Sequence, residues 1–428
     1  MRLQRELFMN KMKQSKVEWI GVIPEEWEVK EISKLFSQRN TKVSDFDFPP
    51  LSVTKQGIVP QLESAAKSDD HTNRKLVKKD DFVINSRSDR KMSSGVSEFD
   101  GSVSLINLVM IPKPEKLSVS FVKYLLKNYG FAEEFYRWGT GIVDDLWSTN
   151  WERGKKIQLP IPPISEQQRI AKFLDEKTAL IDGIITDTKQ TIEELKSYKQ
   201  SLISEIVTKG IDKNVKLVPS GIEWIGEVPE EWEVLKSRYF LNEISVKGYP
   251  DEEVLSLYRD YGIIPKNSRS DNHNVTSLDT SGYKLVEPGN LVINKMKAWQ
   301  GSMAISDLRG IVSPAYYTFE VDNERFDLRF LHYALRNPAY KQEYMRISAG
   351  LRVGQWDLNK NEFKNLKYAF PENKEEQKAI ADYLDEKISQ IDALIIEKEN
   401  VISEYENYKK SMIYEYVTGK KRVEGYES

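Results

Sequence analysis

Residues Val17 to Val29 read VEWIGVIPEEWEV, and residues Ile222 to Val234 read IEWIGEVPEEWEV. Ten of the thirteen positions are identical at an offset of 205 residues. A segment repeated over so long an interval indicates duplication of whole domains. Tryptophan, isoleucine and valine at near-alternating positions, broken by a proline turn, predict an entry segment that packs each domain and fixes its first strand.

Further matches extend the repeat over the whole chain. Phe82 to Asn85 matches Leu291 to Asn294 at an offset of 209, and Leu174 to Lys177 matches Leu384 to Lys387 at 210. Small loop insertions in an old duplication explain this drift. We expect a first domain at 1–163, a first long helix at 164–210, a second domain at 211–371 with a short linker at its start, a second long helix at 372–418 and a C-terminal tail at 419–428.

The fold class predicted from these patterns is α+β. Short β-rich runs such as Leu51 to Thr54 and Val103 to Ile111 lie between turn clusters of Gly, Pro, Asn and Asp, and helical stretches such as Val119 to Tyr129 interrupt them. We therefore expect two similar mixed α/β domains separated by two long helices, with a pseudo-two-fold internal repeat. The strand order does not follow from the sequence.

The two long helices are predicted from their beginnings and from their apolar spacing. Capping boxes are expected at Ser165 to Gln168 and at Asn373 to Glu376. Apolar residues then recur at alternating intervals of four and three, which is typical of a coiled coil, and the short linker after the first helix makes the pair antiparallel. The alternative is that each helix packs on its own domain. The expected seam is Ile181, Ile185, Thr188, Ile192, Leu195, Lys199, Leu202 and Ile206 in the first copy, and Ile391, Ile395, Lys398, Ile402, Tyr405, Lys409, Met412 and Tyr416 in the second.

Composition excludes several classes of protein. The chain has 428 residues and no cysteine, which excludes a disulfide framework and a cysteine nucleophile, and the cytoplasm is the expected compartment. No run approaches eighteen apolar residues, so we expect no membrane span. The net charge is −3, but both helical segments are acidic and the remainder carries +3. Local basic faces are therefore possible on the domains.

The sequence gives no indication of a catalytic site. We find no P-loop, no zinc-protease helix and no nucleophile elbow, and the three histidines stand alone. Asn337 to Tyr340 resembles the Asn-Pro-Pro-Tyr motif of adenine methyltransferases, but it follows a helical run, and no glycine-rich turn for S-adenosylmethionine precedes it. We interpret it as a helix end stopped by Pro338. No cofactor and no metal are expected.

Binding surface is what remains. Basic residues are frequent in Lys67 to Lys91 and in Arg336 to Lys367, and the candidate loops differ between the copies although the framework matches. Arg and Lys reach phosphates and guanine, whereas Gln and Asn read adenine, so these loops suit duplex DNA. Trp147 and Trp356, which match, are expected in the core. The candidate DNA contacts are Lys55, Gln56, Arg87, Arg90 and Lys91 in the first domain, and Tyr258, Arg259, Lys266, Lys295, Lys297, Gln300, Arg352 and Gln355 in the second.

The chain resembles the specificity subunit of type I restriction-modification enzymes over essentially its whole length. The resemblance rests on the order and duplication of several modest motifs. The second copy departs from the first at its exit, where Phe370 to Asn373 replaces the double proline. The motifs are Trp19 to Gly21 with Pro24 to Trp27 and their second copies, Leu159 to Pro163 followed by Glu166 and Gln167, the Leu-Asp-Glu-Lys helices, Asn294 to Gly301, and Gly310 to Ala315.

This resemblance implies a non-catalytic subunit with two target recognition domains, each reading half of a split, asymmetric sequence in double-stranded DNA. It also implies conserved helices that fix the spacing, assembly with two modification (methyltransferase) subunits, and assembly with ATP-dependent restriction subunits. The acidic outer face of the second helix would then be a docking surface for protein. Two other functions remain open from the residues alone, a self-contained adenine DNA methyltransferase and a coiled-coil scaffold with two protein-binding heads.

Overall fold

The computed structural model describes residues 12–62, 71–141, 147–259, 261–269, 279–352 and 355–423, without the side chains of 351, 352 and 355. The chain divides into two compact units. Unit 1 comprises Met1–Thr188 and Asn400–Ser428, and unit 2 comprises Lys189–Glu399. Each unit therefore contains one of the repeated domains, one end of the first long helix and the opposite end of the second.

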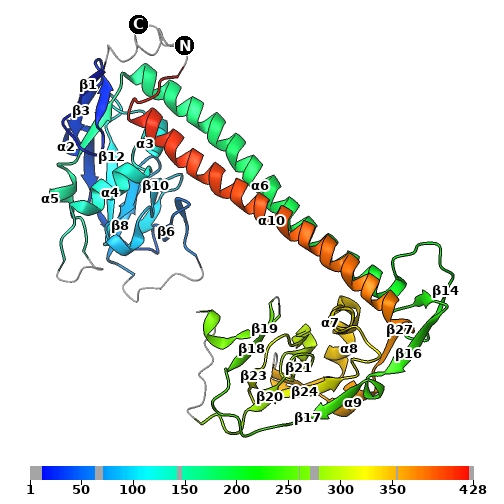
Figure 1. Cartoon of the computed structure of the whole chain (residues 1–428). Coiled ribbons are helices and arrows are strands. Elements are labelled where there is room, and N and C mark those ends of the chain that lie inside the picture. Colours follow the sequence, from blue (N-terminus) through cyan, green and yellow to red (C-terminus); the bar gives the residue numbers. More distant parts are fainter. Residues whose placement is uncertain are drawn as a thin grey trace. The chain divides into compact units, whose positions relative to one another are not determined.

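The domain of unit 1 is built mainly from short strands (Figure 1). They are β1 (Met12–Gln14), β2 (Val22–Pro24), β3 (Glu28–Glu31), β4 (Phe36–Arg39), β5 (Lys42–Val43), β6 (Leu51–Val53), β7 (Ile58–Pro60), β8 (Arg74–Val77), β9 (Phe82–Asn85), β10 (Ser94–Val96), β11 (Gly101–Val103), β12 (Asn107–Pro112) and β13 (Gln158–Ile161). Among the described residues, a four-stranded antiparallel sheet has the order β10-β9-β12-β4, and a smaller sheet has the order β11-β8-β5. Strands β6 and β7 form a separate hairpin, and β13 pairs with β3. The end of the domain thus returns to its entry segment.

Short helices complete this domain. They are α2 (Ile32–Leu35), η1 (Ser88–Arg90), α3 (Val119–Leu125), α4 (Tyr129–Arg137) and α5 (Trp151–Gly154). Asn128 caps α4 by accepting a hydrogen bond from the amide of Phe131. Asn150 caps α5 in the same way through the amide of Arg153.

The domain of unit 2 repeats this arrangement. Its strands are β14 (Leu217–Pro219), β15 (Glu227–Pro229), β16 (Trp232–Lys236), β17 (Leu241–Ile244), β18 (Leu255–Tyr258), β19 (Gly262–Pro265), β20 (Lys284–Val286), β21 (Leu291–Asn294), β22 (Met303–Ile305), β23 (Gly310–Val312), β24 (Tyr316–Val321), β25 (Ser348–Arg352), β26 (Gln355–Leu358) and β27 (Lys367–Pro371). Its helices are η2 (Ser237–Tyr239), η3 (Lys266–Ser268), η4 (Ala298–Gln300), α7 (Leu328–Leu335), η5 (Pro338–Tyr340), α8 (Lys341–Arg346) and α9 (Lys360–Asn365). The main sheet has the order β17-β24-β21-β22, and β18 and β19 form the hairpin that corresponds to β6 and β7.

The repeat is kept at the level of strand register. In unit 1, Leu108 of β12 lies opposite Ile84 of β9. In unit 2, Tyr317 of β24 lies opposite Ile293 of β21, and both residues are displaced by the same 209 positions. Because a slip of one residue would turn every side chain to the other face, equal register means that both domains present equivalent faces. The predicted α+β class and internal repeat are therefore confirmed.

The repeated entry segment lies in the core of unit 1. Ile20, Ile23 and Trp27 have no exposed surface, and they pack in one cluster with residues of the domain and of the long helices. Burial of three large apolar side chains at this point contributes several kcal/mol, at about 1.5–3 kcal/mol each. The segment is therefore structural, as its sequence predicts.

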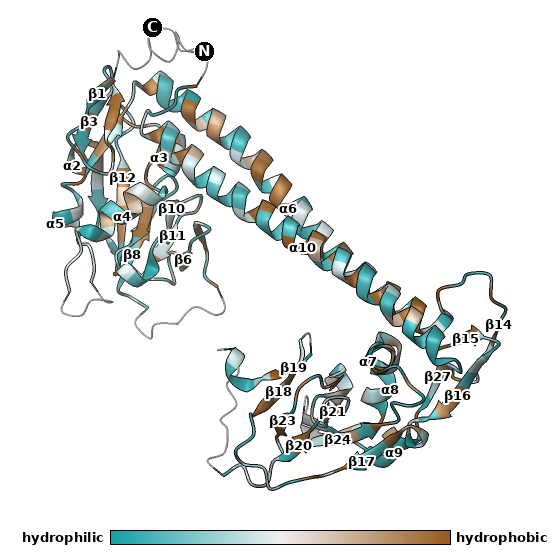
Figure 2. Ribbon diagram, in the orientation of Figure 1, coloured by the Kyte–Doolittle hydropathy of each residue, from teal (hydrophilic) through white to brown (hydrophobic). Residues whose placement is uncertain are grey.

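The first long helix is α6 (Ile164–Lys209) and the second is α10 (Lys374–Val417). In unit 1, Phe173 packs at a tilt against Tyr416 with ring centroids 4.6 Å apart, and Lys409 lies 2.6 Å from Asp182. Because the residue numbers rise along one helix as they fall along the other, the two segments are antiparallel. Figure 2 shows hydrophobic residues recurring along both helices between hydrophilic ones. The predicted coiled coil is confirmed, and the first turns of α6 also pack on the domain.

The helix beginnings differ in part from the predicted capping boxes. The prediction that Ser165 caps α6 is wrong, because the helix begins at Ile164 and the carbonyl of Pro163 accepts the amides of Glu166 and Gln167. The double proline holds the chain extended up to that carbonyl. At α10, the capping by Asn373 is confirmed, since its Oδ1 accepts the amide of Glu375 at 2.9 Å, but the Glu376 carboxylate accepts from Trp232 Nε1 where a capping box would have it accept the Asn373 amide.

No helix in the described part of the chain is long and apolar enough to cross a membrane.

Candidate nucleic-acid interface

Two buried contacts fix each domain on the start of its long helix. In unit 1, Trp27 Nε1 donates to Glu166 Oε2 at 3.0 Å. Gln167 accepts the amide of Ser118 at 2.8 Å and donates to the carbonyl of Pro162 at 2.9 Å. Burial raises the pKa of Glu166, while Arg422 and Trp27 oppose that shift. The two side chains tie the helix start to the domain.

Unit 2 reproduces both contacts. Trp232 Nε1 donates to Glu376 Oε1 at 3.0 Å. Gln377 accepts the amide of Asp327 at 2.9 Å and donates to the carbonyl of Pro371 at 2.9 Å. Glu166, Gln167, Glu376 and Gln377 are thus the anchoring side chains of the repeat, which explains why Glu-Gln recurs at both helix starts.

A further contact positions the helix that follows the main sheet. In unit 1, the hydroxyl of Tyr124 on α3 donates to Asp175 of α6 at 2.6 Å. In unit 2, the hydroxyl of Tyr333 on α7 donates to Asp385 of α10 at 2.6 Å. Each short helix, α3 or α7, is therefore held beside its long helix by one tyrosine-to-aspartate hydrogen bond.

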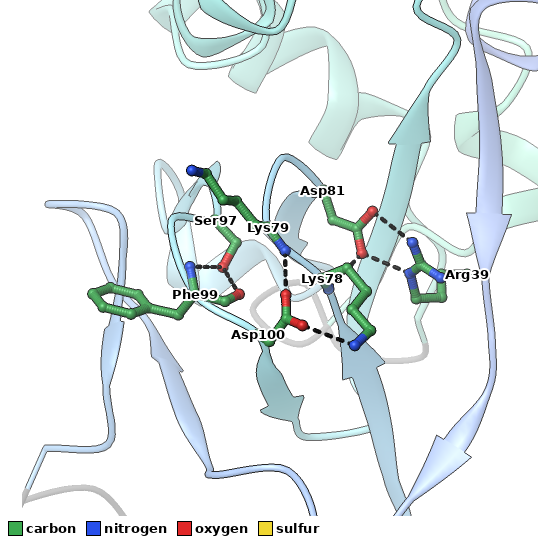
Figure 3. A network of polar contacts seen from close by, with 7 residues as sticks. All are labelled: Arg39, Lys78, Lys79, Asp81, Ser97, Phe99 and Asp100. Atoms are coloured by element: carbon green, nitrogen blue, oxygen red, sulfur yellow. Dashed lines mark hydrogen bonds and ion pairs between the residues drawn. The ribbon is translucent and has the colours of Figure 1, made fainter.

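Much of the basic segment in unit 1 serves the framework. Lys78 Nζ lies 2.8 Å from Asp100, and the amide of Lys79 donates to the same carboxylate at 2.8 Å (Figure 3). Arg39 binds Asp81 through two hydrogen bonds of 2.6 and 3.0 Å. The Lys78 ammonium lowers the pKa of the Asp100 carboxyl. These cations are neutralised within the domain and are poor candidates for phosphate contacts.

Arg74 and Lys75 are also framework residues. Arg74 is 7% exposed and binds Ser102 through Nε at 2.8 Å. Lys75 is 8% exposed and donates to the carbonyl of Asn107 at 2.8 Å. Burial lowers the pKa of both side chains. Of the two, Arg74 also reaches the wall of a hollow on the domain surface.

That hollow has a volume of about 810 Å³ and gathers four of the candidate residues in unit 1. Lys55 and Gln56 lie exposed at the tip of the β6–β7 hairpin. Arg87 and Arg90 lie around η1, and Asp89 sits 3.1 Å from Arg87. The remaining walls are mostly amides and hydroxyls: Ser52, Thr54, Gln61, Asn85, Ser93, Ser104 and Asn107.

The lining of this hollow includes a buried amide oxygen without a hydrogen-bond partner among the described residues, Oδ1 of Asn107. Asn107 is 5% exposed, its Nδ2 donates to the carbonyl of Ser104 at 3.0 Å, and its Oδ1 has no hydrogen-bond partner among the described residues. The cations of the lining can bind phosphates, and its amides can form hydrogen bonds with base edges.

Lys91 lies elsewhere. Its ammonium is 2.9 Å from Glu133, and it lines a different hollow of unit 1 with Trp19 and Trp147. The expectation that Trp147 is a core residue is wrong, because the side chain is 36% exposed. Its counterpart Trp356 is partly buried and packs at a tilt against Trp299, with ring centroids 5.2 Å apart.

In unit 2, a hollow of about 540 Å³ contains Arg259 and Gln300 of the candidate set. Arg259 Nη2 donates to Gln300 Oε1 at 2.9 Å, which joins the β18–β19 hairpin to η4. The lining also includes three basic residues and one acidic residue that the sequence did not suggest as contacts: Lys199, Arg336, Lys341 and Asp392. Its cations outnumber its single carboxylate.

The other candidates of unit 2 are scattered around the same domain. Tyr258 packs edge-on against Tyr261 at 6.4 Å, and the guanidinium of Arg269 lies over both rings. Lys295 is paired with Asp357 at 2.7 Å. Lys297 is exposed and Lys266 opens η3. Arg352 and Gln355 have backbones in β25 and β26, and their side chains lie outside the described residues.

The residues of unit 2 that could suggest catalysis are structural. Burial lowers the pKa of His332 to about 3, with Arg336 adding to the shift, so His332 is neutral at physiological pH. Asn337 is fully buried and accepts the amide of Ala339 at 3.0 Å, while Tyr340 is 3% exposed. This supports the interpretation of Asn337 to Tyr340 as a helix end. The part of the chain that the structure describes contains no cluster of acidic, histidine or cysteine side chains able to hold a metal.

Of the missed residues, Lys199 carries an indication in the sequence. Lys199 and Lys409 occupy apolar positions of the coiled-coil seam, and each pairs with an aspartate of the other helix, at 2.7 and 2.6 Å. A lysine at a seam position is an available sequence indication of a polar site. Arg336 and Lys341 lie in a basic stretch without a distinctive pattern, so only the fold brings them together.

Comparison with known proteins agrees with this arrangement. The family described as type I restriction modification DNA specificity domain matches residues 24–194 and 229–404. The putative type I restriction enzyme MjaX specificity subunit of Methanocaldococcus jannaschii is 24% identical over 94% of this chain and 96% of its own length. The MjaVIII specificity subunit of the same organism is 26% identical over 94% of each.

A solved structure supports the fold independently. It comes from work on complex assembly and conformational transition of a type I R-M system, and one of its chains matches with a TM-score of 0.68 at 13% identity. The match covers 93% of this chain and 99% of the other.

Proposed function

The chain belongs to the type I restriction modification DNA specificity family, and we propose that each of its two domains reads one half of a bipartite, asymmetric DNA target. The proposed recognition domains are residues 1–163 and 211–371. Helices α6 and α10 would set the separation of the half-sites. Subunits of this family carry specificity for a complex, and we propose that methylation and cleavage reside in partner subunits.

One observation carries the proposal. The contacts that fix the domains are the same in both units, whereas the side chains of the two corresponding hairpins differ. In unit 1 the hairpin tip offers Lys55 and Gln56, and in unit 2 the corresponding hairpin offers Tyr258 and Arg259. Two equal scaffolds with unlike polar surfaces suit two readers of unlike DNA sequences.

Within this proposal the cations have different duties. Arg87, Arg90, Arg259, Lys297 and Lys55 are exposed or partly exposed and can reach phosphates or guanine edges. Gln56 and Gln300 are suited to adenine. Lys91, Lys295, Tyr258, Lys266, Arg352 and Gln355 stay predictions from the sequence. Lys91 and Lys295 would have to exchange their carboxylate partners for DNA.

We also assign a docking surface for the modification subunits. Each unit exposes one tyrosine at the same position of the repeat, Tyr408 of α10 in unit 1 and Tyr198 of α6 in unit 2, with 56% and 58% of their surface accessible. Exposed tyrosines are frequent anchors at protein interfaces. Two copies of one anchor suit two copies of one partner, which fits the expected pair of modification subunits. Restriction subunits would join the assembly by binding the modification subunits.

The main test maps adenine methylation across the genome of cells that carry the modification partner, with and without this chain. The expected result is a split motif that appears only when the chain is present. Exchanging the hairpin Val53–Gly57 for Leu257–Gly262 should change one half of that motif and leave the other half intact. A motif in which both halves change would contradict the assignment of one half to each domain.

One control addresses the competing enzymatic function, and a second experiment tests the docking surface. The purified chain should not retain radiolabelled S-adenosylmethionine, and retention would favour a self-contained methyltransferase. Tyr198→Ala and Tyr408→Ala should each weaken the binding of one modification subunit, measured as complex mass. Tyr129→Ala, which removes a tyrosine that is 61% exposed on α4, serves as the matched control.

A further inference from the structure

Lys127 is a partly buried cation beside the turn of the β6–β7 hairpin. It follows α3, and its Nζ lies 3.8 Å from the point where a Cβ would stand on Gly57, the residue after Gln56. No hydrogen-bond or ion-pair partner for this ammonium occurs among the described residues, and the side chain is neither fully exposed nor fully enclosed. A cation in such a place is costly unless an anion reaches it.

The surroundings of Lys127 make the site more positive. Lys123 lies on α3 and pairs with Asp175 at 2.8 Å, and Lys409 of α10 pairs with Asp182 at 2.6 Å. Both carboxylates are thus already occupied by other lysines. Burial, with Lys123 and Lys409 adding to its effect, lowers the pKa of Lys127 to about 8. The cluster carries one unbalanced positive charge.

The repeat keeps a cation at this position but uses it differently. The counterpart in unit 2 is Arg336, at an offset of 209 residues. Arg336 donates to the backbone carbonyl of Arg259 in the β18–β19 hairpin and lies 2.6 Å from Nε2 of His332. The arginine therefore holds its hairpin, whereas the ammonium of Lys127 donates to no acceptor on the equivalent hairpin of the described structure.

We propose that Lys127 binds a backbone phosphate of the DNA strand whose bases meet the tip of the β6–β7 hairpin. This inference rests on the proposed function. An ammonium binds phosphate as a point charge and needs no fixed geometry. Phosphates of one strand follow at about 3.4 Å along the helix axis, so a base beside Gln56 brings a phosphate within reach of its neighbour.

The test compares Lys127→Ala with the wild-type chain, each copurified with its modification partner, on a random-sequence 40-base-pair duplex between 50 and 200 mM salt. Lys127→Ala should bind about five- to tenfold more weakly at 0.1 M salt, and the slope of log K against log salt should fall by about 0.9, the value for one phosphate. Lys127→Arg should retain most of the affinity. Lys34→Ala removes an exposed lysine of the same unit at the end of α2 and should change neither quantity.

A scan with single methylphosphonates locates the contact. One neutral linkage should weaken the wild-type complex and have no further effect on Lys127→Ala. Wild-type protein that binds no duplex at low salt would refute the proposed function itself. Wild-type binding together with an unchanged slope for Lys127→Ala would refute only the phosphate contact. Loss of the modification partner from Lys127→Ala at unchanged DNA affinity would likewise overturn it, and would assign the lysine to an acidic protein surface.

Discussion

The β18–β19 hairpin of unit 2 is bound by an arginine side chain and, among the described residues, the β6–β7 hairpin of unit 1 is not, although the scaffolds beneath them agree closely. The tryptophan-to-glutamate bond is 3.0 Å in both units, and the tyrosine-to-aspartate bond is 2.6 Å in both. In unit 2, Arg336 binds the hairpin backbone and Arg259 binds Gln300. In unit 1, Lys127 makes no such bond. After the duplication, the scaffold was retained and the attachment of the hairpin was free to change.

The largest expected effect comes from removing the shared anchor. Trp27→Ala in unit 1 and Trp232→Ala in unit 2 should each lower the free energy of unfolding by about 3–5 kcal/mol, the usual cost of deleting a buried aromatic side chain. Hydrogen exchange measured by mass spectrometry should place each loss in the unit that carries the change. Both side chains are buried, with 0% of Trp27 and 7% of Trp232 exposed. A much smaller loss for Trp232→Ala would therefore contradict the equivalence of the two scaffolds.

The second effect separates the two hairpins. Arg336→Ala removes the donor to the carbonyl of Arg259, so the amides of β18 and β19 should exchange about tenfold faster, corresponding to roughly 1.4 kcal/mol for a charge-assisted hydrogen bond. Lys127→Ala should leave the exchange of β6 and β7 unchanged, because no bond is lost. Equal acceleration in both hairpins would show that they are held in the same way.

The third effect concerns stability and pH. The pKa of Lys127 is lowered to about 8, below its value in an unfolded chain, so its charge opposes folding at neutral pH. Between pH 8 and 10.5 the ammonium has lost its proton in the folded state but keeps it in the unfolded state, so the free energy of unfolding should rise over this range. Lys127→Met should therefore raise the melting temperature of unit 1 by about 2–4 °C at pH 7, while weakening DNA binding.

The control for this prediction is the pH dependence of affinity. Since phosphate favours the charged lysine, wild-type DNA affinity should fall between pH 7 and 9, and that fall should be smaller in Lys127→Met. The other charged groups at the site are Lys123 and Asp175, which pair with each other, and Lys409 and Asp182, which do the same. A lower melting temperature for Lys127→Met would contradict the assignment.

The smallest effect is expected at the lysines of the helix seam. Lys409→Ala in unit 1 and Lys199→Ala in unit 2 remove ion pairs to Asp182 and Asp392 that are partly open to water. Each should cost about 0.2–1 kcal/mol, less at high salt. Differential scanning calorimetry at 0.05 and 0.5 M salt measures this. A salt-independent loss would point to packing of the lysine stem instead.

The same comparison explains what the sequence could predict. Residues that maintain the scaffold recur in the second copy at offsets of 205 to 210 residues, so the entry segment, Glu166 with Gln167 and the apolar seam are visible without coordinates. The hairpin tip with Lys55 and Gln56 was predictable because a short turn between two apolar runs places its middle residues in water.

Other parts of the site depend on contacts between distant residues. Lys91 lies in a basic segment, and only the fold brings Glu133 to within 2.9 Å of it. Arg74 and Lys75 look like surface charges in the sequence, but both end buried in strand β8. Lys127 stands alone in the sequence, and its significance arises from Gly57, which lies seventy residues earlier.

The C-terminal segment has a consequence for synthesis on the ribosome. Tyr414 donates to the carbonyl of Trp19, Lys420 to that of Ile20, and Gly419 is packed so closely on Pro24 that a Cβ would stand 2.4 Å from it. Unit 1 therefore needs both ends of the chain, whereas unit 2 is one continuous stretch, Lys189–Glu399. At about 5–20 residues per second, the first domain waits roughly 10–40 s with an uncovered apolar flank until its last helix emerges. A nascent chain arrested before Tyr414 would present that flank to chaperones, and the domain made first would be the one completed last.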